Sequence, residues 1–349
     1  MTNIKKIPFI FAILSFLTFF TSANSEIKVV TSIKPIHSLA SYLMEGVGRP
    51  SLIVDGYASP HGFAMKPSHA KMLQEADIIF WVGEGLENFL DKPLKTVAKN
   101  AEKIELIEIK ALNKLKFRER NIFDDHDHDE HGHDDHGKKE DDHDHDDHGK
   151  KEDDHDHDHD DHGKKDDDHD DHGHDDHDGH AHGEFDPHIW LDPVNAKVIL
   201  KEMAEHLIEN DEKNSAIYKK NLAKALKDID VLIKNTKSEL SKSVASIVFH
   251  DAYQYFEERF NVNILGAFTV NTDVMPGAEQ LAEVREIIEH EKVACVFSEP
   301  QFNPDIIKAV AKDMDIKTGV VDPLGATLNP GKDLYFKLIQ NMSTSFKNC

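Results

Sequence analysis

The chain has 349 residues, which is enough for two domains of ordinary size. Its formal net charge is −25, but residues 124–183 hold 28 acidic residues against six lysines, a balance of −22, so the rest of the chain carries only −3. The acidity therefore belongs to one segment, and the lack of any basic stripe in the sequence argues against nucleic-acid binding.

Residues 1–25 have the layout of a secretory signal peptide. Two lysines, an apolar run from Ile7 to Phe20 and small residues near Ala23 follow one another in the order of such signals. The apolar run is short for a membrane span, although an uncleaved membrane anchor is the alternative. No cysteine follows the small residues, so the sequence shows no lipoprotein attachment site. We expect export through a cleavable signal and residence in the periplasm.

Short apolar runs alternate with helical patterns after the signal. Continuous apolar runs separated by helices indicate parallel βα units in a sheet that is covered on both faces. The predicted strands are the start of IKVVTSIKPIHSLASYL, PSLIVDG at 50–56, DIIFWVG at 77–83 and KIELIEI at 103–109. The predicted helices are the end of the first of these stretches, KPSHAKMLQEA and LENFLDKPLKTVAKN. We assign residues 26–210 to an N-terminal α/β lobe.

Residues 124–183 form an insertion in this lobe and have no apolar periodicity. The heptapeptide HDDHGKK begins there three times, at His133, His145 and His159. High charge and low hydrophobicity predict that the segment is disordered when it holds no metal. Of the 25 histidines in the chain, 18 lie in it, and tracts of this composition bind metals. These candidate auxiliary ligands are His126, His128, His131, His133, His136, His143, His145, His148, His155, His157, His159, His162, His169, His172, His174, His177, His180 and His182.

Two helices are predicted after the insertion, the first over 194–209. The second runs from about 212 to 240, because its apolar residues recur every three to five positions, as on one face of a helix. Those residues are Ile217, Leu222, Leu226, Ile229 and Ile233. We assign residues 211–242 to a long, rigid connecting helix.

The alternation of strands and helices restarts in residues 243–349, the C-terminal α/β lobe. The predicted strands are ASIVFH at 245–250, NILGAF at 263–268, ACVFSEP and KTGVVDP, and the predicted helices are DAYQYFEERF, GAEQLAEVREIIEHE and PDIIKAVAKDM. We therefore expect two Rossmann-like lobes with parallel sheets joined by the long helix. Ligands of open α/β sheets bind beyond the carboxyl ends of the strands, which places the expected metal site in the cleft between the lobes.

The chain has two cysteines, Cys295 and Cys349. In an oxidising compartment a disulfide between them is the favoured interpretation, and it would tie the C-terminal residue to the body of the second lobe. Two ligands of a metal site are the alternative, which is weaker because neither cysteine has another cysteine or a histidine at ligand spacing.

Four residues near strand ends could together bind a divalent metal. His61 follows the strand at 50–56, His188 follows the insertion, His250 ends the strand at 245–250, and Asp322 ends the last strand. Three imidazoles and one carboxylate suit a metal of the zinc type, and four protein ligands leave no vacancy for catalysis. Spacing alone does not select these four.

Three other residues near strand ends or loops are further candidate metal ligands, and they are Glu299, Asp251 and His37. The remaining histidines lie in helical patterns and are expected to face solvent, and they are His69, His206 and His290.

Several segments resemble the metal-binding components of bacterial ABC transporters that import zinc and manganese. They are ASPHGFAMKPSHAKMLQEADIIFWVG, DPHIWLDP, FHDAYQYFEERF, GAFTVNTDVMPGAEQL, CVFSEPQF and VDPLG. Apart from the insertion, these segments span nearly the whole mature chain. The acidic histidine-rich insertion and the late cysteine pair also match the family. Among the members of that family, the zinc-binding ones are the most similar.

The resemblance implies a ligand set. It assigns His61, His188 and His250 as ligands, with a carboxylate matched by Asp322 as the fourth. Some zinc members use a water instead, or a glutamate just before the first histidine, which Pro60 excludes here. Manganese members tend to have a glutamate at position 250, and hard oxygen ligands do favour manganese, so His250 favours Zn²⁺.

The resemblance also implies a function, which is high-affinity capture of Zn²⁺ and its delivery to a membrane permease, with ATP hydrolysed by a separate subunit. We expect a monomer that is not an enzyme. A manganese- or iron-carrying member of the same family is one alternative. A zinc-dependent hydrolase is another, but the sequence has no H-E-x-x-H motif and no serine nucleophile elbow. Zinc storage or adhesion is a third alternative. The segment GATLNPGKD does not have the spacing of a phosphate-binding loop, so the sequence offers no nucleotide site there.

The insertion is then expected to assist a site elsewhere. Each ion that the insertion binds must order the residues around it, which costs about 1–2 kcal/mol of conformational entropy per residue. Its sites should therefore be weaker than a preformed pocket. We expect it to capture or buffer zinc and to feed the pocket, or to sense zinc excess. A solvated acidic tether that is indifferent to metal is the alternative.

Overall fold

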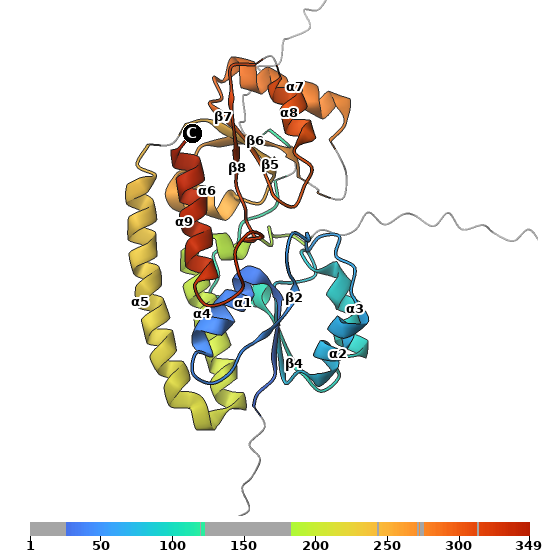
Figure 1. The fold of residues 1–349 in the computed structure, drawn as a ribbon, viewed down its shortest axis with the longest axis vertical. Coiled ribbons are helices and arrows are strands. Elements are labelled where there is room, and N and C mark those ends of the chain that lie inside the picture. The colour runs from blue at the N-terminus through green and yellow to red at the C-terminus, as the bar shows by residue number, and fades with distance from the viewer. Residues whose placement is uncertain are drawn as a thin grey trace, which may run out of the picture. The chain divides into compact units, whose positions relative to one another are not determined.

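The computed structural model describes residues 26–118, 120–122, 183–242, 244–270, 272, 276–312 and 314–349. The predicted signal peptide and the histidines of the insertion lie outside these residues. Within the described part, two four-stranded parallel sheets with their helices confirm the predicted α/β fold of two lobes (Figure 1).

The first sheet has the strand order β2-β1-β3-β4. Its strands are β1 (Val29–Ile33), β2 (Ser51–Val54), β3 (Ile78–Trp81) and β4 (Glu102–Glu105). The two central strands, β1 and β3, are buried along their whole length, as expected for a parallel sheet that is covered on both faces. The connecting helices are α1 (Lys34–Leu43), α2 (Pro67–Glu75) and α3 (Asn88–Thr96), and β4 runs into the short helix η1 (Leu106–Glu108).

The second sheet has the order β6-β5-β7-β8. Its strands are β5 (Ser246–His250), β6 (Ile264–Thr269), β7 (Cys295–Ser298) and β8 (Lys317–Val320), with helices α6 (Gln254–Phe260), α7 (Ala278–His290) and α8 (Asp305–Ala311). Alternate side chains of β5 enter different cores: Val248 faces the core shared with the first lobe, whereas Ile247 and Phe249 join the one beneath α7 and α8.

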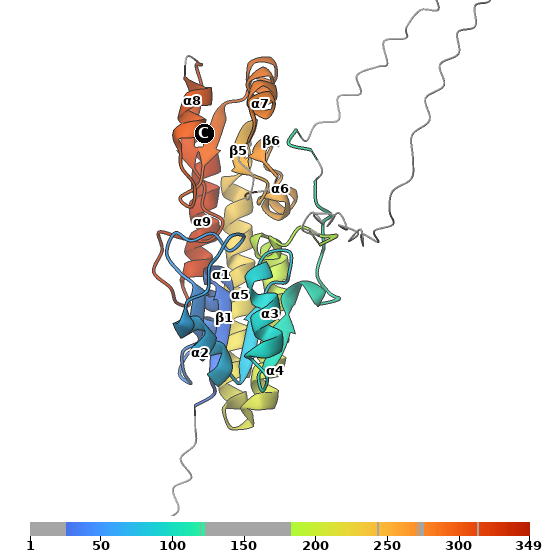
Figure 2. The same cartoon turned by 90° about the vertical axis from the view of Figure 1, so that its right-hand side faces the viewer.

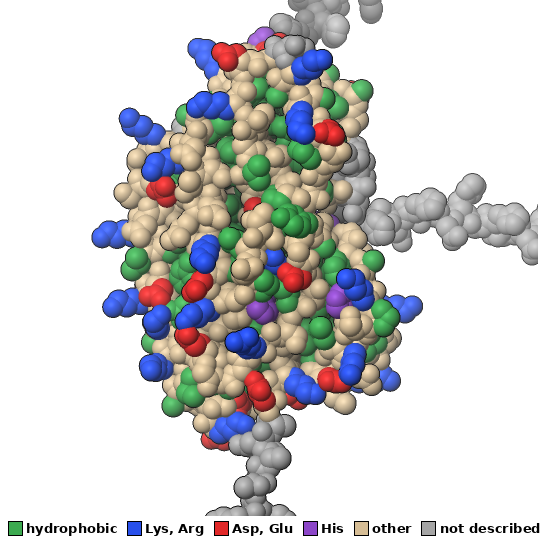
Figure 3. All heavy atoms as spheres, in the orientation of Figure 1, with side chains coloured by type: hydrophobic (Ala, Val, Ile, Leu, Met, Phe, Trp, Pro, Cys, Tyr) green, Lys and Arg blue, Asp and Glu red, His purple; other side chains and the backbone are tan. Residues whose placement is uncertain are grey.

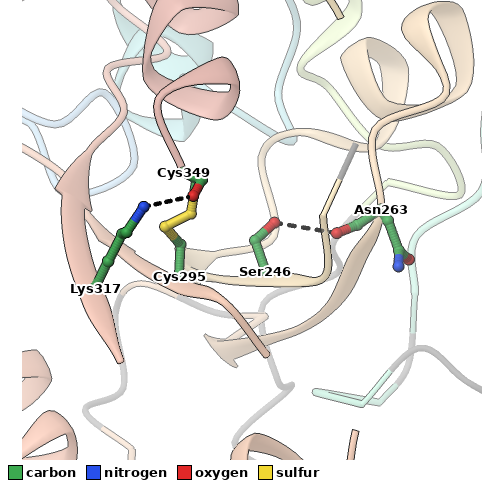
Figure 4. Close-up of a disulfide and its surroundings, with 5 residues drawn as sticks. All are labelled: Ser246, Asn263, Cys295, Lys317 and Cys349. Carbon is green, nitrogen blue, oxygen red and sulfur yellow. Dashed lines mark hydrogen bonds between the residues drawn. A yellow bond between two sulfur atoms is a disulfide. The ribbon is translucent and has the colours of Figure 1, made fainter. Parts of the chain in front are cut away.

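The cysteines form the predicted disulfide (Figure 4). Cys295 begins β7 and Cys349 is the last residue, 54 positions later, with 5.9 Å between their Cα atoms. Lys317 of β8 donates from Nζ to the carbonyl oxygen of Cys349 at 3.0 Å. The C-terminus is thus held against the second sheet.

Three long helices pack together beside the sheets. They are α4 (Pro193–Asn210), α5 (Ser215–Glu239) and α9 (Leu334–Lys347), and two short helices, η2 (Ile189–Leu191) and η3 (Glu212–Asn214), precede α4 and α5. Helix α5 lies beside α1, α4 and α9 (Figures 1 and 2). Helix α9 has no counterpart among the predicted elements. It begins at the first lobe, where Tyr335 donates from its backbone nitrogen to Ser38 Oγ at 2.9 Å, and it ends beside the second sheet, where Cys349 is bonded to Cys295.

Residues 113–118 and 120–122, called the arm below, lead from the first lobe to the second sheet. Ile122 pairs antiparallel with Gly266 of the edge strand β6, and the carbonyl oxygen of Asn121 accepts a hydrogen bond from Ala267 at 2.8 Å. A Cβ atom at Gly266 would lie 2.6 Å from that carbonyl oxygen. Glycine at 266 is therefore what lets the arm approach the strand.

Basic side chains are spread over the face drawn in Figure 3, with acidic ones among them. They do not gather into a single stripe on this face. This distribution agrees with the balance of −3 outside residues 124–183.

The close approach at Gly266 generates a stability prediction. We expect Gly266→Ala to lower the free energy of unfolding by roughly 1–3 kcal/mol, because the added methyl group forces the arm or β6 to shift. Gly277→Ala is the matched control, since a Cβ atom there meets nothing within 4 Å. Chemical denaturation of both variants measures the difference, and equal stabilities would contradict the packing described.

Candidate metal centre

Three histidines from separate parts of the chain meet at one point. His61 lies in the loop between β2 and α2, His188 immediately precedes η2, and His250 is the last residue of β5. Their ligand nitrogens all lie within 4.8 Å of one another, and the Nε2 atoms of His188 and His250 are 3.4 Å apart. His188 and His250 are buried, whereas His61 is half-buried.

Buried carboxylates hold two of these rings. Asp186 Oδ1 accepts hydrogen bonds from His188 at both Nδ1, 2.7 Å away, and the backbone nitrogen, 2.9 Å away. Glu299 Oε1 lies 2.6 Å from Nδ1 of His250. A carboxylate that accepts from Nδ1 places the ring proton there and leaves Nε2 with a lone pair for a metal. Both rings therefore present Nε2 to the centre of the group.

The two buried imidazoles differ in their electrostatics. Burial holds the pKa of His188 well below its usual value of 6.5, which keeps this ring neutral. Burial also disfavours the charged form of His250, but the nearby Glu299 carboxylate outweighs it, and the pKa of His250 lies above 6.5. Burial raises the pKa of Asp186 to about 7. The ring of His188 is therefore neutral and offers a free lone pair at Nε2, whereas the ring of His250 takes up a proton more readily.

The walls around the histidines are largely apolar. Besides the three rings and Glu299, the cavity is lined by Pro60, Leu86, Trp190, Gln301, Phe302, Pro323 and Leu324. Trp190 donates from Nε1 to the carbonyl oxygen of Pro323 at 2.8 Å, which ties the first lobe to the loop after β8. Apolar walls exclude water and lower the local dielectric constant, so charge interactions inside the cavity are stronger than at the surface.

Asp322, the predicted fourth ligand, is not part of this three-histidine group. Its Oδ1 atom accepts from Gly325 at 2.9 Å, Leu324 at 3.1 Å and Gln301 Nε2 at 3.0 Å, and so organises the turn after β8. Its Oδ2 atom is buried and has no hydrogen-bond partner. The assignment of Asp322 as a ligand stays a prediction.

The other candidates occupy several environments. Glu299 supports His250, Asp251 pairs with Arg118, and His37 lies 3.1 Å from the carbonyl oxygen of Pro50. The expectation that His69 faces solvent is wrong, because its ring is buried and stacks on Phe63 with 5.4 Å between the centroids. His206 pairs with Glu102, and His290 is exposed.

The role of Asp186 was not predicted. Its sequence signal was the D-P-H tripeptide, in which a carboxylate two residues before a histidine can reach Nδ1 of the ring. The tripeptide alone does not show that both side chains become buried together.

The family model of ZnuA, described as zinc-uptake complex component A periplasmic, matches residues 29–349. The chain belongs to the ZnuA family. Among curated ZnuA proteins, the high-affinity zinc uptake system protein ZnuA of Brucella abortus (strain 2308) is 43% identical over 329 residues, which cover 94% of this chain and 92% of that protein. The protein of the same name from Yersinia pestis is 35% identical, over 92% and 90% of the two chains.

Solved structures of ZnuA and its neighbours share the fold. A zinc-bound ZnuA deletion mutant superposes with a TM-score of 0.67 at 20% identity, and 93% of this chain and 98% of that one are covered. The periplasmic zinc-binding protein TroA from Treponema pallidum superposes with a TM-score of 0.68 at 14% identity, over 93% and 99% of the chains. Among the described residues of the present chain, no helix is both long enough and apolar enough to cross a membrane.

The contact between Glu299 and His250 generates a prediction about affinity. We expect Glu299→Gln to weaken Zn²⁺ binding about 10- to 100-fold, because the amide no longer orients the ring or raises its basicity as the carboxylate does. Glu286→Gln, at an exposed position on α7, is the control. Competition against a chromophoric zinc chelator measures both. Equal affinities would show that Glu299 does not support the site.

The raised pKa of His250 generates a prediction about pH. A proton on His250 must leave before Zn²⁺ binds. As the pH is lowered, the affinity for Zn²⁺ should therefore start to decline while the pH is still above 6.5, and it should decline further at lower pH. In Glu299→Gln the decline should begin at a lower pH, since the carboxylate that raises the pKa is gone. Titrations between pH 5 and about 8 cover the range of histidine protonation. Superposable pH profiles for the two proteins would exclude this coupling.

Proposed function

We propose that this chain captures Zn²⁺ in the periplasm with His61, His188 and His250 and delivers it to the membrane permease of an ABC transporter, whose separate subunit hydrolyses ATP. The observation that carries the proposal is the convergence of three ring nitrogens, from three segments of the chain, within 4.8 Å of one another. Membership of the ZnuA family supports it, as do the names of the curated relatives.

The donor set favours zinc over manganese. Three imidazole nitrogens in an apolar cavity suit a borderline metal such as Zn²⁺, whereas Mn²⁺ prefers carboxylate and water oxygens. A tetrahedral zinc site needs a fourth ligand, for which Asp322 and a water molecule are the two candidates. The buried Oδ2 atom of Asp322, which has no hydrogen-bond partner, supports the first of these.

The arrangement suits binding and release, and we infer no catalysis. Asp186 and Glu299, the carboxylates that touch the histidines, are engaged in orienting rings and so are not placed as general bases. His61 and His188 belong to the first lobe and His250 to the second. A permease that changed the relative position of the lobes would therefore separate the ligands and lower the affinity for the metal.

The insertion completes the proposal as an auxiliary element. Its 18 histidines would hold zinc more weakly than the pocket, because chain must be ordered around each ion. Weak, numerous sites would concentrate zinc near the pocket when the metal is scarce. Residues 1–25 would direct the chain to the periplasm and be removed.

Competitive zinc titration of the mature protein tests this function. We expect one tight site in the intact protein and in a variant that lacks residues 124–183, with much weaker binding of Mn²⁺ to both. His188→Ala or His250→Ala should weaken the tight site by more than the roughly 10- to 100-fold expected from loss of a supporting carboxylate. His290→Ala is the control because His290 is exposed on α7, away from the group.

Two outcomes would refute the assignment. If the tight site disappeared with residues 124–183, the histidine repeats and not the three-histidine group would be the functional centre. If His188→Ala and His290→Ala bound zinc equally well, the buried group would be structural.

A further inference from the structure

We propose that Arg118 is a positioning residue for the metal site: through the arm, it holds the segments that carry His188 and His250 in their binding arrangement. This inference rests on the proposed function. Arg118 does not belong to the three-histidine group and would act through Asp251, the residue that follows His250.

The arm is bonded to the segment that carries His188. The carbonyl oxygen of Leu115 accepts from the backbone nitrogen of Asp186 at 2.8 Å, and Lys116 forms a β-bridge with Phe185. The hydroxyl of Tyr255, on α6 of the second lobe, accepts from Leu115 and donates to the carbonyl oxygen of Asp186, at 3.1 and 2.8 Å. Asp186 in turn orients the ring of His188, so the arm holds in place the segment that carries this ligand.

Arg118 extends the arm to the segment that carries His250. Its guanidinium donates to Asp251 Oδ1 at 3.1 Å and to Glu257 Oε2, on α6, at 2.6 Å. The Asp251 side chain is only 6% exposed, so without Arg118 it would be a buried carboxylate that had lost its counter-charge. One planar guanidinium thus joins the end of β5 to α6, an arrangement that a single ammonium group does not reproduce.

Beyond Arg118 the arm ends on β6, the neighbour of β5. Asn121 and Ile122 bond to Ala267 and Gly266, and Thr269 of the same strand accepts from the backbone nitrogen of Asp251 at 3.1 Å. The arm therefore connects the segment of Asp186 to the segment of Asp251 through its contacts with α6 and β6. These connections limit how far His188 and His250 can separate, and a preorganised site releases its metal slowly.

Zinc dissociation kinetics test this role. The full-length mature protein with one equivalent of Zn²⁺ is mixed with an excess of a chromophoric chelator. We expect Arg118→Met to release zinc about tenfold faster, the lower end of the range for groups that support metal ligands. Arg118→Lys keeps the positive charge and should release zinc at a rate between those of the wild type and Arg118→Met. Arg120→Met is the matched control, an exposed arginine two positions along the arm.

A second readout separates positioning from general stability. The visible spectrum of the Co²⁺-loaded protein should change in Arg118→Lys, while its melting temperature without metal stays close to that of the wild type. Zinc release at the wild-type rate from folded Arg118→Lys and Arg118→Met would overturn the inference and leave the proposed function intact. If the wild type showed no tight zinc site, or if His250→Ala left that site intact, the proposed function would fail, and this inference would fail with it.

Discussion

The contact between a buried carboxylate and the Nδ1 atom of a histidine is the interaction on which this site depends. A free imidazole can present either nitrogen and rotates about two bonds, so three unsupported histidines would not converge on one ion. Asp186 and Glu299 remove that freedom for His188 and His250. Because each carboxylate accepts at Nδ1, both Nε2 atoms are left facing the same point, 3.4 Å apart. The centroid of the remaining ring, His61, lies 5.5 Å from that of His188 and 5.9 Å from that of His250.

The buried carboxylates that support the histidines bring negative charge into the interior, and the surrounding structure compensates this charge. Buried negative charges need partners: His188 donates a hydrogen bond to Asp186, and the protonatable His250 and the guanidinium of Arg118 supply positive charge. Arg118 also links the two lobes, since it reaches from the arm to Asp251 and Glu257. The same contacts therefore balance charge and restrain the distance between the ligands that the lobes contribute. In a carrier, this restraint and the need to release the ion oppose each other.

The packing of α5 and α9 gives the lobes a common framework. One hydrophobic core extends from the first sheet, through the helices, to residues of the second lobe such as Phe256 and Phe297. The hydroxyl of Tyr335 on α9 donates to the carbonyl oxygen of Trp190, two residues after His188. Any movement that opens the site must therefore be small or must occur about these helices, since separating the lobes completely would expose the shared core to water.

Local pattern was sufficient for most of the fold. Continuous apolar runs such as 77–83 predicted buried parallel strands, and the period of three to five residues predicted α5, because these signals reflect burial of neighbouring residues. Helix α9 was not predicted: its apolar face is covered by α1 and α5, which are distant in the sequence. The burial of His69 against Phe63 was missed because helical periodicity indicates a face of a helix but not what covers it.

The sequence by itself determined the kinds of ligand available, and its resemblance to a transporter family singled out His61, His188 and His250. Only the tertiary structure decided that these three meet, that Asp186 and Glu299 orient two of them, and that Oδ1 of Asp322 organises a turn. The physical reason is that a side chain's chemistry is written in its own residue, whereas its orientation and charge depend on neighbours that folding brings from elsewhere. Arg118 shows this most clearly: in the sequence it is one basic residue before an acidic insertion, and in the fold it joins two lobes.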